Sequence, residues 1–227
     1  MRKRTIRVFI VVLIAALFVT GCSFATAGGL SDSSIASSAP SGDDNASSGP
    51  ESSSAASSEV PVTEDKAGLG KVLIVYYSFT GNTREVADLL KDKTGGATFE
   101  IEPDFDYNRP DVEAVAKEQV NEGFKPKLKT AVSDIETYDV IFVGSPIWWF
   151  SVTPPVMSFL SETDLAGKKV VPFCTYIDAY GDFFKQFEAA CPDAQVVSGR
   201  DFKSAELKDS DALEAKIDAW LAEIKEG

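Results

Sequence analysis

Residues 68–227 predict an α/β fold, a doubly wound five-stranded parallel sheet with helices on both faces. Short apolar runs alternate with segments whose apolar residues recur at helical spacing, and this alternation predicts strands joined by crossover helices. Most of the runs are continuous, as is typical of strands buried on both faces. About 160 residues suffice for one well-buried core and are too few for two.

The expected strands come in chain order from these runs. The first, third and fourth are uninterrupted apolar stretches, the second is short, and the fifth follows a proline-containing turn. Their ranges are 71–77, 97–101, 139–144, 169–174 and 194–202.

The expected helices lie between the strands and after the last one. The first carries Val86, Ala87 and Leu90 on one face, and the third begins at Pro154, where a missing N–H is tolerated. The last has apolar residues at helical spacing from Leu213 to Ile224. The ranges are 83–93, 111–122, 154–160, 183–190 and 209–224.

Three loops follow strands at the edge where such sheets bind ligands, the carboxyl ends of the strands. The first contains hydroxyl and amide side chains around a glycine, directly before a helix whose free N–H groups favour an anion. Its residues are Ser78, Phe79, Thr80, Gly81, Asn82 and Thr83. The loop therefore indicates a phosphate site, although a tight turn with a Thr or Asn helix cap has the same composition.

The second loop places two tryptophans at the same edge. Trp148 and Trp149 are adjacent, so one ring can pack inward while the other faces a ligand. A flat aromatic ligand would favour such a ring against it. The alternative is that both rings pack the loop onto the domain or contact a partner.

The motif S-x-T-G-N-T after the first strand resembles the FMN-phosphate loop of flavodoxins. The segment from Tyr138 to Trp149, then Pro154-Pro155 and Pro172-Phe173, is similar to a short flavodoxin-like family common in bacteria. The resemblance covers about residues 70–227. It implies strand order 2-1-3-4-5 and FMN as cofactor, with the backbone near the two tryptophans facing the flavin N5.

The resemblance also extends the list of expected cofactor-binding residues beyond the first loop. They are Pro146, Ile147, Trp148, Trp149, Thr175, Tyr176 and Tyr180. Two departures from the family pattern put the flavin geometry in doubt: Phe150 stands where glycine is usual, and the 175–182 loop is poor in glycine. The two tyrosines can stack on the second flavin face or partly close the site, and Asp178 can lie near the ring.

The first 22 residues predict a lipoprotein leader. Four basic residues precede the twelve apolar residues 8–19, a run too short to span a bilayer comfortably. The segment 1–21 is therefore interpreted as a signal peptide and Cys22 as the acylated first residue of the mature chain. Residues 22–67 are rich in serine and predict a disordered tether. The expected location is the extracytoplasmic side of the cell membrane. An ordinary secretory signal and an uncleaved anchor are the alternatives.

Charge and composition narrow the classes of partner. The net charge of −13 becomes −17 when the four basic residues of the leader are removed, which argues against nucleic acid and anionic lipid as partners. It favours basic protein partners, expected to be redox proteins, or simply keeps the protein soluble. The chain has no histidine, so the commonest general base and metal ligand is absent, and no metal site is expected. Cys174 and Cys191 are expected to be buried free thiols. A disulfide between them is the alternative.

These observations leave three functional hypotheses. The first is an FMN-binding electron-transfer protein at the outer face of the membrane, and it is favoured over a turnover enzyme because the flavin supplies the redox chemistry. The second is a flavin-dependent NAD(P)H:quinone-type oxidoreductase. The third is an interaction module without flavin.

Overall fold

The structure, a computed structural model, describes residues 64–227. The predicted signal peptide, Cys22 and nearly all of the predicted tether lie outside the described residues. Within residues 64–227 no helix combines the length and the apolar character that crossing a membrane requires.

The described chain alternates strands and helices, as the sequence predicts. The strands are β1 (Val72–Tyr76), β2 (Ala97–Glu100), β3 (Val140–Trp148), β4 (Ser151–Val152), β5 (Lys169–Tyr176), β6 (Gln195–Val196) and β7 (Arg200–Lys203). The α-helices are α1 (Asn82–Thr94), α2 (Val112–Glu122), α3 (Pro154–Glu162), α4 (Phe183–Ala190) and α5 (Ser210–Glu226). Two short 3-10 helices, η1 (Ile135–Thr137) and η2 (Glu206–Lys208), complete the fold.

The sheet has the order β2-β1-β3-β5-β6, and these neighbours pair in parallel. The predicted order 2-1-3-4-5 is thereby confirmed, with one difference at its end. The expected strand 194–202 is two strands, β6 and β7, which pair with different parts of β5. Between them lies Gly199, where an added Cβ would come within 2.4 Å of the Pro172 carbonyl oxygen. The chain therefore passes β5 too closely there for a side chain.

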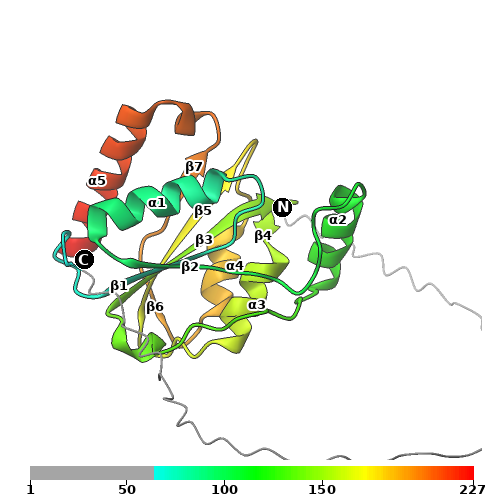
Figure 1. The fold of residues 1–227 in the computed structure, drawn as a ribbon, viewed down its shortest axis with the longest axis horizontal. Coiled ribbons are helices and arrows are strands. Elements are labelled where there is room, and N and C mark those ends of the chain that lie inside the picture. Colours follow the sequence, from blue (N-terminus) through cyan, green and yellow to red (C-terminus); the bar gives the residue numbers. More distant parts are fainter. Residues whose placement is uncertain (1–63) are drawn as a thin grey trace, which may run out of the picture. The chain divides into compact units, whose positions relative to one another are not determined.

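Helices cover both faces of the sheet, as expected (Figure 1). On one face α1 and α5 pack against alternate residues of β1, and the fully buried Trp220 lies at the centre of that core. On the other face α3 and α4 pack against the intervening residues of β1. The carboxyl ends of the strands are left for the connecting loops.

The segment expected as a loop after the third strand is a tight hairpin. β3 extends to Trp148 and turns back through Trp149 and Phe150 into β4, with Trp148 paired to Ser151. Both turn residues have positive φ, 50° and 62°, a conformation that hairpin turns usually give to Asn and Gly. Bulky residues held there cost about 1–3 kcal/mol each. The hairpin nevertheless holds both tryptophans at the ligand edge.

The two described cysteines are separate thiols. Cys174 and Cys191 are both buried and unpaired, so the disulfide alternative is wrong. Burial raises the pKa of Cys191 to about 11, and it raises the pKa of Cys174 further. Both thiols therefore stay protonated at neutral pH and act as core packing.

Candidate functional site

A cavity of about 420 Å³ lies at the carboxyl edge of the sheet, within the size range of small-molecule sites. We call it the aromatic cavity. Its walls come from the first loop, α2, the β3–β4 hairpin and the loop after β5. The lining residues are Phe79, Val112, Glu113, Ala116, Ile147, Trp148, Trp149, Phe150, Tyr176, Ile177, Asp178 and Ala179.

Trp148 is the fixed wall of the aromatic cavity. Its ring meets Tyr77 and Phe79 edge to face, with ring centroids 5.7 Å away in each case. Tyr107 meets the same indole at 5.0 Å. Three edge contacts hold this ring in one orientation, because aromatic pairs favour such geometry over loose stacking.

Trp149 and Phe150, at the tip of the hairpin, are more exposed. Trp149 is 40% exposed, and the Lys117 ammonium lies 4.8 Å from its ring centroid. Phe150 abuts the loop after β5, since a Cβ at Gly181 would lie 2.5 Å from the Phe150 carbonyl oxygen. The tip of the hairpin and the 175–182 loop therefore close against each other beside the cavity.

The opposite wall is anchored by Tyr176. Its hydroxyl donates to Asp201 Oδ2 at 2.9 Å. Burial, together with this hydrogen bond, raises the pKa of Tyr176 to about 12, so the phenol stays neutral at physiological pH. Tyr180 packs on Tyr176 with ring centroids 5.6 Å apart and supports the wall from outside the lining.

The first loop leaves the N-terminus of α1 open to an anion. Gly81 caps the helix in the left-handed conformation, with φ 101° and no side-chain capping bond. The Arg84 amide donates to Ser78 Oγ and the Glu85 amide to the Gly81 carbonyl. Among residues 64–227, the amides of Asn82 and Thr83 have no acceptor. Two helix-terminal N–H groups are therefore free to bind a phosphate.

Two side chains of this loop are engaged within the protein. The buried Thr83 hydroxyl forms a hydrogen bond with Thr175 Oγ1 at 2.9 Å, and Asn82 Nδ2 donates to Ser204 Oγ at 3.0 Å. Thr80 is exposed. The donors that face outward are thus the backbone amides and Thr80, while Asn82 and Thr83 position the loop.

The structure brings the three predicted loops together, but not every predicted residue reaches the aromatic cavity. Phe79, Ile147, Trp148, Trp149 and Tyr176 line it. Pro146 and Thr175 pair across β3 and β5, behind the lining.

Sequence reasoning missed the face of α2 that carries Val112, Glu113 and Ala116. It also missed Ser204, which holds Asn82 and donates to the Tyr176 carbonyl. Ser204 follows the last strand of the sheet, so its place at the carboxyl edge is the signal that could have found it.

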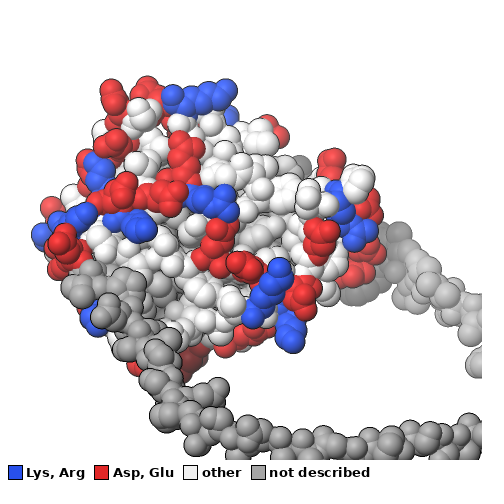
Figure 2. All heavy atoms as spheres, in the orientation of Figure 1, with Lys and Arg blue, Asp and Glu red and all other residues white. Residues whose placement is uncertain are grey.

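Besides the neutral Tyr176 phenol, the ionisable groups that line the aromatic cavity are two carboxylates, Glu113 and Asp178. Elsewhere on the face shown in Figure 2, acidic and basic side chains are intermingled. Ion pairs such as Lys93 with Asp218 join α1 to α5. In the part of the chain that the structure describes, no group of three His, Cys, Asp or Glu side chains lies close enough to hold a metal ion.

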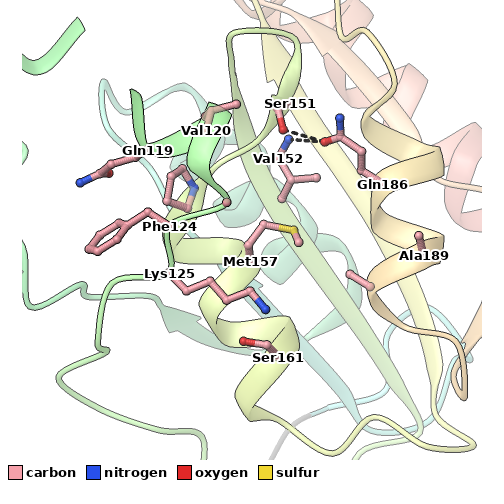
Figure 3. A pocket seen from close by; sticks show the side chains of 13 residues that line it. Gln119, Val120, Phe124, Lys125, Ser151, Val152, Met157, Ser161, Gln186 and Ala189 are labelled. Carbon is pink, nitrogen blue, oxygen red and sulfur yellow. Dashed lines mark hydrogen bonds between the residues drawn. The ribbon is translucent and has the colours of Figure 1, made fainter. Parts of the chain in front are cut away.

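A second cavity of about 540 Å³ lies between the end of α2, β4, α3 and α4 (Figure 3). It shares no lining residue with the aromatic cavity. It is also separate from the first loop, so the predicted phosphate site and this cavity are different places. Its lining residues are Gln119, Val120, Gly123, Phe124, Lys125, Ser151, Val152, Pro154, Met157, Ser161, Gln186, Ala189 and Ala190.

Comparisons with known proteins agree on one family. A flavodoxin profile matches residues 71–223. A protein from Bacteroides eggerthii, provisionally described as a flavoprotein, is 29% identical with a TM-score of 0.55, over 66% of this chain and 97% of its own. A similarly described protein from Bacteroides uniformis is 27% identical with a TM-score of 0.55, over 65% and 97%.

A more distant structure shares the fold. It is a flavoprotein from Lactobacillus acidophilus in complex with FMN, 22% identical with a TM-score of 0.53 over 58% of this chain and 93% of its own. No curated protein matches the chain significantly.

Proposed function

This chain belongs to the flavodoxin family, and on that premise we propose that it binds FMN at the carboxyl edge of its sheet and transfers electrons through it. One observation carries the proposal. The open N-terminus of α1 and the aromatic cavity lie at the same edge, and Phe79 belongs to both. A site for an anionic group thus stands next to a site for a flat ring.

The residues of the first loop fit the phosphate end of FMN. The free amides of Asn82 and Thr83 lie at the N-terminus of α1, where the partial positive charge of the helix dipole would favour the phosphate. Thr80 adds an exposed hydroxyl beside them. A cofactor that ends in a phosphate should therefore bind better than riboflavin, which has none, and better than FAD, whose phosphate carries a further nucleotide.

The aromatic cavity fits the ring end of FMN. Trp148 and Tyr176 offer fixed aromatic walls that exclude water, and Phe150 and Ile177 lie at the exposed rim. FMN supplies the one- or two-electron chemistry, and the protein positions it and sets its potential. The carboxylates of Glu113 and Asp178 disfavour an anionic reduced flavin and so lower that potential.

We further propose that the protein works as a carrier at the outer face of the membrane. The sequence before residue 64 supports a lipid on Cys22 and a serine-rich tether, which would hold the domain near the membrane without fixing its orientation. The acidic chain suits basic protein partners and opposes the phosphates of NADPH. Apart from the first loop, the sequence shows no motif that would bind a nicotinamide dinucleotide.

Stopped-flow mixing of the FMN-loaded protein with NADPH, and separately with dithionite, tests the carrier against the reductase. In an electron carrier, dithionite should bleach the visible absorbance of the bound flavin promptly, and NADPH should bleach it slowly or not at all. Rapid bleaching by NADPH, followed by turnover on a quinone, would place the protein among NAD(P)H:quinone-type oxidoreductases. A protein that retains no FMN at all would instead be the flavin-free interaction module.

A further inference from the structure

Hydrogen bonds tie together the elements that surround the second cavity. Gln186 Oε1 accepts from Ser151 Oγ at 2.7 Å and from the Val152 amide at 3.2 Å, which ties α4 to β4 (Figure 3). Outside the lining, Ser158 Oγ donates to the Pro126 carbonyl at 2.7 Å and ties the chain after α2 to α3. The cavity is therefore preformed, and a ligand would not have to open it.

The walls of the second cavity combine an apolar centre with one positive charge. Val152, Pro154 and Met157 form the apolar part. Lys125 is the one ionised side chain of the lining, and no carboxylate lines the cavity although the chain has 35 acidic and 22 basic residues. Among residues 64–227 no carboxylate lies within salt-bridge distance of Lys125.

The polar groups lie around the apolar centre. Figure 3 draws the Lys125 side chain with its nitrogen toward the Ser161 side of the cavity, and Met157 in the middle. The Phe124 ring turns away from the cavity, toward Phe105, whose ring centroid is 6.1 Å away. The cavity thus offers a thioether and a proline ring in its apolar part and an ammonium at one end.

We propose that the second cavity binds a small aromatic carboxylate. Its ring would lie against Met157 and Pro154, because methionine sulfur makes favourable contacts with aromatic rings. Its carboxylate would face the Lys125 ammonium, since a lysine without a protein carboxylate attracts an anion and repels a cation. The Ser161 hydroxyl beside it already donates to the Ser158 carbonyl at 2.9 Å, so the ammonium is the donor left for the ligand. Glu122, Glu162 and Glu188 on the surrounding helices are exposed, as Lys125 itself is, so solvent screens all four charges; of these, Lys125 alone lines the cavity.

The site is independent of the proposed FMN function, because the two cavities share no residue. The test is calorimetric titration of the full-length protein, with excess FMN present, against 2-naphthoate and against the neutral 2-naphthamide. We expect naphthoate to bind at least about fivefold more tightly than naphthamide. Equal affinities, or no binding of either probe at millimolar concentration, would overturn the proposal.

Two variants locate the probe. Lys125→Gln should abolish the preference for naphthoate and leave naphthamide binding unchanged, whereas Lys127→Gln, an exposed neighbour outside the lining, should change neither. Ala189→Phe should fill the cavity and weaken both probes at least tenfold, with an unchanged thermal midpoint as the check on folding. Retention of the preference in Lys125→Gln, or an equal loss in Lys127→Gln, would place the probe elsewhere and contradict the inference.

Discussion

Phe79 and Trp148 meet edge to face, with ring centroids 5.7 Å apart and ring planes at 88°. Phe79 belongs to the loop before α1, and Trp148 ends β3. Their contact joins the first loop, the proposed phosphate site, to the aromatic cavity. The two halves are therefore set relative to each other by the protein itself, before any ligand is bound.

The two tryptophans should differ when each is replaced. Trp148→Ala removes three ring contacts at about 0.5–1.5 kcal/mol each, so the free energy of unfolding should fall by about 1.5–4.5 kcal/mol. Trp149→Ala loses an exposed cation–π contact and should change it by less than about 1 kcal/mol. Both variants should weaken FMN binding, which urea unfolding and fluorescence titration can check. Equal stability losses would show that Trp148 is not the fixed wall.

The phosphate loop should discriminate between FMN and riboflavin. Thr80→Ala removes a donor to a charged group, worth about 1.5–3 kcal/mol, so FMN should bind at least about tenfold more weakly. Riboflavin affinity should hardly move. Thr130→Ala, an exposed threonine outside the site, serves as the matched control. A similar loss for both ligands would mean that the loop does not hold the phosphate.

Stability should decline in alkali because of buried phenols. Burial raises the pKa of Tyr77 and Tyr107 far above the ordinary value of 10.0, so the folded chain keeps protons that the unfolded chain releases. Above about pH 10 each of these phenols lowers the stability by about 1.4 kcal/mol per pH unit, in addition to the loss from the two buried thiols, which begins near their ordinary pKa of 9.0. Urea unfolding at a series of pH values measures the slope. Tyr77→Phe should reduce the slope by the contribution of one phenol, about 1.4 kcal/mol per pH unit. An unchanged slope would refute the assignment of this alkaline loss of stability to Tyr77.

The lipid on Cys22 is a prediction of the sequence alone. Cys22→Ala should release the protein from membranes or leave an uncleaved precursor, because the acylated residue and the processing site are lost together. Fractionation and mass spectrometry of the full-length protein measure both effects. If membrane association and the processed mass stay the same, the lipoprotein interpretation fails.

The sequence predicted the strands, the helices and the sheet order, because buried parallel strands and amphipathic helices have strong periodic signals. It did not predict the β3–β4 hairpin. Trp149 and Phe150 occupy left-handed positions that Asn and Gly normally mark, so the turn had no recognisable signature. The break between β6 and β7 depends on the close passage of Gly199 past Pro172, which only the packed sheet reveals.

The sequence predicted those parts of the candidate site that lie within short contiguous motifs. Trp148 and Tyr176 are the last residues of β3 and β5, Phe79 lies in the loop after β1, and all three line the aromatic cavity. Glu113 lies on a helix whose docking the sequence does not specify, so its place in the lining came from the structure. The second cavity likewise arises where three helices and a two-residue strand meet, and no single segment encodes it.

The most direct test is a titration of FMN with the purified full-length protein, followed by flavin fluorescence and by the visible flavin band. Binding in the aromatic cavity predicts saturable quenching at one FMN per chain and a changed visible band, with both effects weakened in Trp148→Ala and Thr80→Ala. An unaltered spectrum of free FMN at micromolar protein would contradict the account.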